Sequence, residues 1–208
     1  MDKVILKNVY KEIKGVTVLR DINFTLKKRM IYGLFGHNGS GKTMLLRMIA
    51  GLIKPTSGEV YIDGKKLHTD MDFPESIGVI IETPDFWSNY TGKEVLKTLA
   101  EIKKIINDND IDKALQRVGL DPKDKRVIKK YSLGMKQRLG IAQAIMESPD
   151  ILLLDEPTNA LDKSGIELAR KIIREERDRG ALVVIASHNV ADLEECQIKI
   201  ELSDGSIV

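Results

Sequence analysis

Alternating apolar and polar residues characterise the first third of the chain. Val4, Leu6 and Asn8 alternate with Ile5, Lys7 and Val9, and Ile22, Phe24 and Leu26 alternate with polar neighbours. A period of two is typical of strands that bury one face. Gly15 and Asp21 are turn-forming residues between these segments. Further strands are predicted over residues 30–35, 58–62 and 77–81.

Apolar residues recur at helical spacing in the middle of the chain. We predict helical structure from about residue 91 to 118 and a second helix over 132–147, where Met135, Leu139 and Ala142 share one face. A shorter helix is predicted from Lys42 to just before Gly51, a residue that commonly ends helices.

Two apolar runs, residues 151–154 and 182–186, lack polar alternation, as do strands covered on both faces of a parallel sheet. Between them lies a predicted helix, Lys163 to Arg179, which ends at Gly180. This strand–helix–strand order predicts an α/β sheet with right-handed crossovers. We expect one domain over residues 1–208: a catalytic core with a β subdomain (1–83 and 150–208) and an inserted helical subdomain (about 84–149).

Composition narrows the possible partners. The 33 basic and 31 acidic residues leave a formal charge of +2, which gives no overall electrostatic reason to expect nucleic acid. No apolar stretch approaches the roughly 20 residues that a membrane-spanning helix needs. The single cysteine, Cys196, excludes an internal disulfide bond, and its simplest interpretation is a structural one.

A phosphate-binding loop is predicted between a strand and a helix, where the sequence fits GxxxxGK[ST]. Its glycines allow backbone N–H groups to point inward around phosphate oxygens, and the helix N-terminus adds a positive dipole. We expect Lys42 to reach the β and γ phosphates, Thr43 to bind magnesium, and His37 to contribute only its backbone. The eight residues are Gly36, His37, Asn38, Gly39, Ser40, Gly41, Lys42 and Thr43.

Two carboxylates follow the apolar run at 151–154. A buried strand that ends at Asp155 would place this carboxylate beside the phosphate loop, at the edge where open α/β sheets bind ligands. Asp155 can then hold magnesium through its water shell. Glu156 can polarise the water that attacks the γ-phosphate.

These motifs, with three further matches, occur in the order typical of ATP-binding cassette (ABC) ATPases, and the resemblance covers roughly residues 3–208. The segment from Tyr131 to Arg138 resembles the family's signature sequence, which meets the γ-phosphate of ATP held by the other subunit. Ser132 is also a good helix N-cap. This chain keeps Ser132 and Gly134 of the usual Leu-Ser-Gly-Gly-Gln but has Leu133 and Met135.

The resemblance assigns two further residues. Asp162, at the end of Asn159-Ala160-Leu161-Asp162, resembles the acidic member of the loop that crosses the dimer interface. His188, after Ser187, resembles the switch histidine, which can hydrogen-bond the γ-phosphate and hold the attacking water.

Two positions depart from the family. Glu82 stands where a glutamine is usual, and its carboxylate could still contact magnesium or its water. This feature and the altered signature resemble the branch associated with export of, or immunity to, peptide antibiotics such as bacitracin and lantibiotics. Ile13 occupies the position of the aromatic residue that stacks on adenine, so the base is expected to contact Ile13 or Tyr10.

The resemblance implies a P-loop NTPase core with a mainly parallel sheet, an N-terminal antiparallel β subdomain and an inserted α-helical subdomain. It also implies an ATPase that uses ATP and Mg²⁺, pairs as a homodimer or heterodimer, and powers a separate transmembrane permease. Such a protein would be cytoplasmic and peripheral on the inner face of the cell membrane. Phe86, Trp87 and Tyr90 either dock the permease or pack locally.

Two other functions are compatible with the motifs. One is a soluble ABC ATPase in repair, translation or iron–sulfur assembly, although the chain lacks the second cassette or coiled-coil insertion usual there. The other is a nucleotide-dependent binding module without turnover, which the presence of both Glu156 and His188 disfavours.

Overall fold

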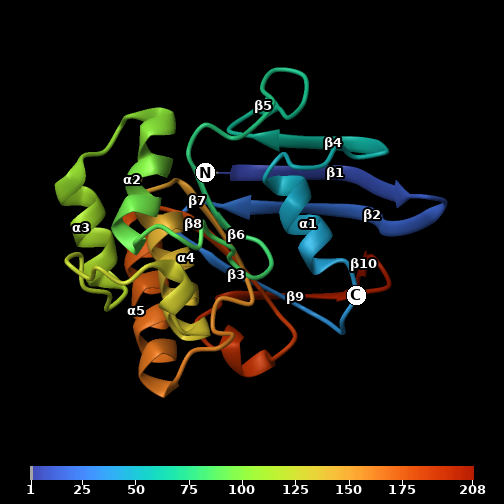
Figure 1. The fold of residues 1–208 in the computed structure, drawn as a ribbon. Helices are drawn as coiled ribbons and strands as arrows, with labels where there is room; N and C mark the ends of the chain where they lie inside the picture. Colours follow the sequence, from blue (N-terminus) through green and yellow to red (C-terminus); the bar gives the residue numbers. More distant parts are fainter. Residues whose placement is uncertain (1) are drawn as a thin grey trace.

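Two β-sheets enclose helix α1 (Lys42–Ile49) in the computed structural model of the chain, which describes residues 2–208 (Figure 1). The side chains of Leu45, Leu46, Met48 and Ile49 of α1 are fully buried, and they belong to one core cluster with side chains of both sheets. Because α1 begins at Lys42, within the predicted phosphate-binding motif, this core fixes the position of the loop.

The first sheet is antiparallel, with strand order β2-β1-β4-β5. Its strands are β1 (Asp2–Ile13), β2 (Val16–Lys27), β4 (Ser57–Ile62) and β5 (Lys65–Lys66). The alternation predicted for residues 4–9 breaks at Asn8, whose φ of 49° accompanies a register shift that turns Val9 toward the core. Asp21, with a φ of 47°, lies within β2 and does not separate two strands.

The second sheet has the order β10-β9-β3-β8-β7-β6, and all its pairings are parallel except that of β9 with β10. Its strands are β3 (Ile31–Phe35), β6 (Ile77–Ile80), β7 (Ile151–Asp155), β8 (Leu182–Ser187), β9 (Ile198–Ser203) and β10 (Ser206–Ile207). β7 and β8 are buried along their whole length, as their uninterrupted apolar runs predict.

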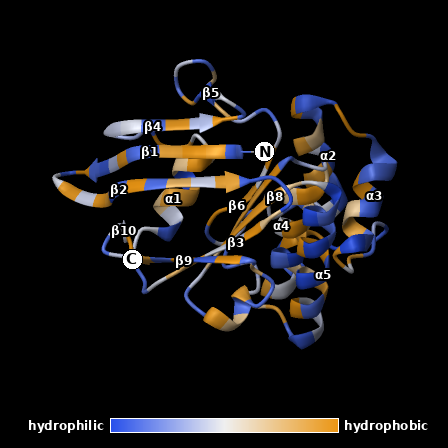
Figure 2. Cartoon of the chain, turned by 180° about the vertical axis from the view of Figure 1, so that it is seen from behind, coloured by the Kyte–Doolittle hydropathy of each residue, from blue (hydrophilic) through white to orange (hydrophobic). Residues whose placement is uncertain are grey.

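The remaining helices lie on the side of the molecule away from the antiparallel sheet (Figure 1). They are α2 (Gly92–Lys103), α3 (Asp108–Arg117), α4 (Leu133–Ile145) and α5 (Lys163–Arg179), with short 3₁₀ turns at Ile128–Lys130 and Val190–Leu193. The bounds of α5 match those predicted. In Figure 2 the apolar colour is concentrated in the central strands and on the helix faces that meet them.

The helical segment predicted over residues 91–118 is two helices. Lys104 adopts a left-handed φ of 56° and ends α2, and the Asn107 side chain caps α3 by accepting hydrogen bonds from the N–H groups of Asn109 and Asp110. Ile102 and Ile105, on either side of Lys104, are exposed. The chain turns because the cap at Asn107 satisfies the N–H groups of a new helix.

Ion pairs connect the subdomains. Lys3, which is buried in β1, donates to Asp150 at 2.9 Å just before β7 and also pairs with Asp63. Arg117 at the end of α3 contacts buried Glu176 of α5 at 2.8 Å. Because each pair contains a buried charge, removing one partner would leave that charge without compensation. Within residues 2–208, no helix is long and apolar enough to cross a membrane.

Substitution of Gly78 in β6 tests how closely α4 packs against the sheet. A Cβ atom at Gly78 would lie 1.8 Å from the carbonyl oxygen of Ala144 in α4. Because the obstacle is backbone, Gly78→Ala should lower the free energy of unfolding by about 3 kcal/mol, measured by urea unfolding. Gly64→Ala is the control, since nothing lies within 4 Å of its Cβ, and we expect a loss of about 1 kcal/mol for its left-handed backbone. Equal losses in the two variants would contradict this packing.

Candidate functional site

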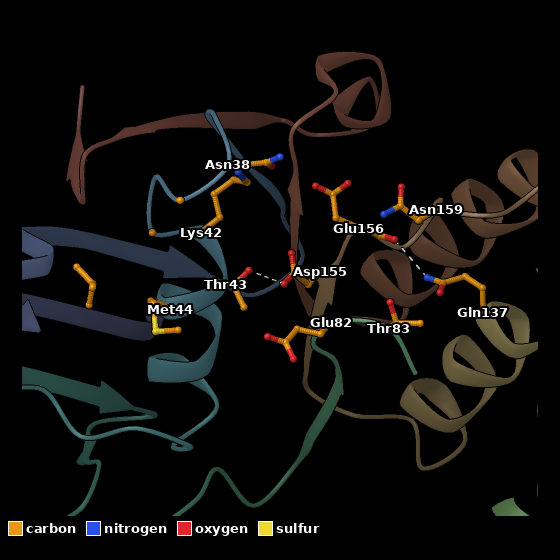
Figure 3. Close-up of a pocket in the computed structure, with 13 residues that line it drawn as sticks. Asn38, Lys42, Thr43, Met44, Glu82, Thr83, Gln137, Asp155, Glu156 and Asn159 are labelled. Carbon is orange, nitrogen blue, oxygen red and sulfur yellow. Dashed lines mark hydrogen bonds between the residues drawn. The ribbon is translucent and has the colours of Figure 1, made fainter. Parts of the chain in front are cut away.

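A pocket of about 480 Å³ opens at the carboxyl edge of the parallel sheet (Figure 3). Residues that are far apart in the sequence converge on it: the loop after β3, the loop after β6, and the two carboxylates at the end of β7. The lining residues are Val18, Asn38, Gly39, Gly41, Lys42, Thr43, Met44, Glu82, Thr83, Gln137, Asp155, Glu156 and Asn159.

The loop over residues 36–43 has the geometry of an anion cradle. Gly36 tolerates no side chain, because a Cβ there would lie 2.1 Å from the carbonyl oxygen of Leu202. Gly41 has a φ of 107° and precedes α1, which has no side-chain N-cap. Within residues 2–208, no acceptor is hydrogen-bonded to the backbone N–H groups of Lys42 and Thr43, the first of the helix. These donors are the groups that a helix N-terminus offers to phosphate.

Three side chains of the loop differ in what they offer to a ligand. The Lys42 ammonium donates to the carbonyl oxygens of Gly36 at 2.8 Å and His37 at 3.1 Å, so it is folded back over the loop. The His37 ring is exposed and lies 3.6 Å from Asp204. Ser40 is fully buried, and its hydroxyl has no hydrogen-bond partner among the described residues.

Thr43 and Asp155 form a pair suited to magnesium. The Thr43 hydroxyl donates to Asp155 at 2.7 Å across the pocket (Figure 3). Burial raises the pKa of the Asp155 carboxyl, and the adjacent Glu156 carboxylate raises it further. A divalent cation would offset both effects. Within residues 2–208 no cluster of three or more His, Cys, Asp or Glu residues could hold a metal. These residues therefore fit Mg²⁺ that takes its other ligands from phosphates and water.

Glu82 lines the same pocket, but its carboxylate is paired with another group. Arg47 of α1 donates to Glu82 Oε1 at 2.6 Å, and the Glu82 side chain is largely exposed. Glu82 would have to leave Arg47 before contacting a metal or its water. Its role as a metal ligand therefore stays a prediction.

The Glu156 carboxylate is held by residues at the end of β8. It accepts hydrogen bonds from the backbone N–H of His188 at 2.9 Å and from the Ser187 hydroxyl at 3.0 Å. Nδ1 of His188 lies 2.7 Å from the same carboxylate. Because a carboxylate can only accept, Nδ1 carries the proton, and Nε2 is left available to a water molecule or a ligand.

The predicted signature residues lie in a different pocket of the same chain, about 920 Å³ in volume. Ser132 caps α4 by accepting a hydrogen bond from the N–H of Met135 at 3.1 Å. Leu133, Gly134 and Met135 line this second pocket together with Asp162. None of these residues lines the pocket that contains the phosphate loop.

Asp162 has partners within its own chain. It caps α5 by accepting from the N–H of Gly165 at 2.8 Å, and it pairs with Arg138 of α4 at 3.2 Å. These hydrogen bonds, chiefly that from Gly165, hold the pKa of the Asp162 carboxyl below its ordinary value. A contact across a dimer interface stays a prediction for this residue.

The structure places Ile13 and Tyr10 in β1, and neither is among the residues that line the first pocket. Val18, in the next strand, does line it. Contact of Ile13 or Tyr10 with a nucleotide base stays a prediction. No role was predicted for Gln137, although it lies within the signature-like segment and is a buried polar residue on an apolar helix face.

Comparisons with known proteins agree with this geometry. The ABC transporter family model matches residues 19–159. The uncharacterised ABC transporter ATP-binding protein YybJ of Bacillus subtilis is 51% identical over 96% of this chain and 92% of its own length. The bacitracin transport ATP-binding protein BcrA of Bacillus licheniformis is 43% identical over 84% of this chain, and the matched region covers 58% of the length of BcrA. A dimeric structure of MJ0796, a bacterial ABC transporter cassette, matches with a TM-score of 0.88 and 28% identity, over 98% of this chain and 96% of the cassette.

Replacing Thr43 tests the proposed metal ligands. Thr43→Val keeps the shape of the side chain but removes the hydroxyl that donates to Asp155. We expect the free energy of unfolding to fall by about 1.5 kcal/mol, and the affinity for MgADP to fall about tenfold more than that for metal-free ADP. Urea unfolding and calorimetric titration measure the two effects. Thr43→Ser keeps the hydroxyl and is the matched control; if it binds MgADP no better than Thr43→Val, the assignment is wrong.

Proposed function

This chain belongs to the ABC transporter family, in which it is an ATP-binding and ATP-hydrolysing subunit, and we propose that two such subunits pair on ATP to drive a separate membrane permease. The pair binds two ATP molecules between its members. Each phosphate loop then faces the Ser132 segment of the other subunit.

One observation carries this proposal: the chain divides its ATP-binding motifs between two separate pockets. The phosphate loop, Asp155 and Glu156 line one pocket, while Ser132 and Gly134 line the other. In the second pocket, Ser132 and the start of α4 present the positive end of a helix, which favours a phosphate group. The phosphate loop of the same chain lies in the other pocket. A second copy in a head-to-tail arrangement supplies that phosphate, and the dimeric cassette of 28% identity supports such pairing.

Residues of the first pocket perform the chemistry in this proposal. Lys42 and the free N–H groups at the start of α1 bind the β and γ phosphates, and Thr43 and Asp155 hold Mg²⁺, which neutralises charge on the transferred phosphoryl group. Glu156 accepts a proton from the attacking water. His188, oriented through its Nδ1 contact with Glu156, positions that water or the γ-phosphate.

The transported molecule is proposed from the relatives. BcrA is a bacitracin transport protein, and the resemblance to its branch noted from Glu82 and the altered signature is confirmed by 43% identity. We therefore propose peptide antibiotics as the cargo class, in export or immunity. The matched family and the named relatives are transporter ATPases, and nothing favours the alternative of a soluble cassette in repair or translation.

We place the permease on a groove between the loop after β6 and α2. This groove is about 380 Å³ in volume and is lined by Asp85, Phe86, Trp87, Leu99 and Gln143. For the aromatic residues of this segment the sequence left open two roles, docking and local packing, and their side chains differ in this respect. Phe86 packs against the core cluster that the helices share with the parallel sheet, whereas the Trp87 side chain is half exposed. Trp87, with Tyr90 at a ring-centroid distance of 5.7 Å, is the proposed contact for the permease. Such docking would place the chain on the inner face of the cell membrane.

Glu156→Gln tests self-pairing and the general base together. The amide oxygen of Gln still accepts from the N–H of His188, so the loop should keep its shape while losing the base. We expect ATP hydrolysis to fall by about 10²- to 10⁴-fold, and light scattering to show a shift from monomer to dimer with ATP and Mg²⁺. Glu156→Gln combined with Lys42→Ala, which cannot bind the phosphates, should stay monomeric. If Glu156→Gln binds ATP but keeps the monomer mass, the homodimer proposal fails.

Trp87→Ala tests the docking groove. Because the side chain is half exposed, the change should leave the unfolding free energy within about 0.5 kcal/mol of the parent and ATP hydrolysis by the isolated chain unchanged. Co-sedimentation with membranes that contain the permease should fall at least about tenfold, as for an aromatic residue at the centre of an interface. Phe73→Ala removes an aromatic residue of similar exposure outside the groove and should not affect sedimentation. Equal sedimentation of all three proteins would refute docking at Trp87.

A further inference from the structure

Glu156 occupies a backbone conformation that its neighbours must maintain. Its φ of 48° lies in the left-handed region, which is unfavourable for a residue with a β-carbon. Its N–H donates to the carbonyl oxygen of Ala186 at 2.9 Å, which fixes one side of the peptide to β8. The carboxylate is held by Ser187 and His188. Its carbonyl oxygen accepts a hydrogen bond from the backbone N–H of Asn159, in the same loop, at 3.2 Å.

Gln137 of α4 supplies a second donor to that carbonyl oxygen, from outside the loop. Its side-chain amide donates to the carbonyl oxygen of Glu156 at 3.2 Å (Figure 3). It also donates to the carbonyl oxygen of Pro157 at 3.0 Å. The residue is only 6% exposed. A primary amide has two N–H groups, so each carbonyl receives one. Gln137 therefore holds the peptide that carries Glu156.

The same face of α4 contacts the rest of the loop that follows Glu156. Gly134 lies against the carbonyl oxygen of Ala160, where a Cβ would come within 2.9 Å. Arg138 pairs with Asp162 at 3.2 Å. Gly134, Gln137 and Arg138 are spaced by three and one residues, so they lie on one side of the helix. The first turns of α4 and the loop over residues 156–162 are thus joined at three points.

We propose that Gln137 is a positioning residue for Glu156, and that through α4 it links the Ser132 segment to the base in the same subunit. This inference rests on the proposed function, in which Glu156 is the base and Ser132 meets ATP bound by the other subunit. Ser132 and Gln137 are about 7.5 Å apart along one rigid helix. A shift of the helix N-terminus on contact with the partner's nucleotide is carried to the Glu156 carbonyl, because the Gln137 amide follows the helix.

The hydrogen bonds from α4 to the Glu156 loop give the buried Gln137 amide a function. An apolar side chain would remove the donor to the Pro157 carbonyl oxygen and leave the Glu156 carbonyl oxygen with the N–H of Asn159 alone, so the left-handed peptide would lose its connection to α4. A displacement of about 1 Å at a catalytic group is enough to lower the rate by about 100-fold. Gln137 touches neither the nucleotide phosphates nor the attacking water in this proposal, so its removal should affect turnover and leave binding intact.

The test replaces Gln137 with Met, which has a similar shape but no N–H groups, and with Asn, whose amide is too short to reach both carbonyls. We expect kcat to fall by about 10- to 100-fold in both variants, with KM for ATP unchanged. Gln116→Met is the control, since Gln116 is exposed on α3, and should match the parent. Thermal unfolding shows whether Gln137→Met folds. If it does not, kcat and KM of Gln137→Asn are compared with those of the parent.

A second arm separates positioning of the base from a general effect on the fold. In the Glu156→Gln background the base is absent, so adding Gln137→Met should leave the residual hydrolysis rate and the ATP-dependent dimer mass unchanged. The inference would be overturned if Gln137→Met lowered the rate by the same factor in the parent and in Glu156→Gln. It would also be overturned if Gln137→Met weakened ATP binding instead of lowering kcat, or if kcat did not change.

The two proposals fail in different ways. If Glu156→Gln itself hydrolyses ATP at the parent rate, Glu156 is not the base, and the proposed mechanism fails together with the role of Gln137. If Glu156→Gln is inactive while both Gln137 variants turn over normally, the mechanism stands and only the positioning role is lost.

Discussion

The parallel pairing of β3, β8 and β7 is the interaction on which the rest of the site depends. In this register Phe35 lies opposite Ser187, and Asp155 lies opposite Ala186, so the three strands end at one level. The phosphate loop follows the first strand, His188 the second and Glu156 the third. Motifs separated by more than a hundred residues therefore meet at one edge, where an open α/β sheet binds its ligands. A slip of one residue in either pairing would turn Asp155 away from Thr43.

Rigid packing around that edge supports conformations that an isolated chain would avoid. Glu82, Glu156 and Ala160 all have positive φ values, and they lie within or beside the two pockets. Such residues persist only where surrounding contacts determine them. Here the contacts are backbone hydrogen bonds to a fully buried strand and side-chain bonds from α4. These backbone conformations lower the stability of the fold, but they hold the base and the turn that follows it in the geometry that the reaction requires.

The sequence predicted the elements whose pattern is local and regular. The apolar runs of β7 and β8, the helix Lys163–Arg179 and the phosphate loop were each readable from contiguous residues. The break between α2 and α3 was missed because a cap at Asn107 outweighs continuing helical periodicity. The bulge at Asn8 was missed because it depends on pairing with β2 and β4. No individual role was predicted for Val18, Arg47 or Gln137, since each acts through a contact with a distant segment, although Gln137 lies within the segment that resembles the signature.

Division of the ATP-binding motifs between two pockets gives the molecule a way to make turnover conditional. If the phosphate loop and the Ser132 segment of one chain faced the same nucleotide, a monomer could complete the site and hydrolyse ATP without its partner. The two lie in separate pockets, and both α4 and the loop after β7 line both of them. The N-terminus of α4 lines the second pocket and its Gln137 lines the first. A helix transmits a displacement along its length because its backbone hydrogen bonds keep it rigid. The geometry therefore couples the base of one site to the occupancy of the other, which is what a motor needs if hydrolysis is to wait until both subunits have closed.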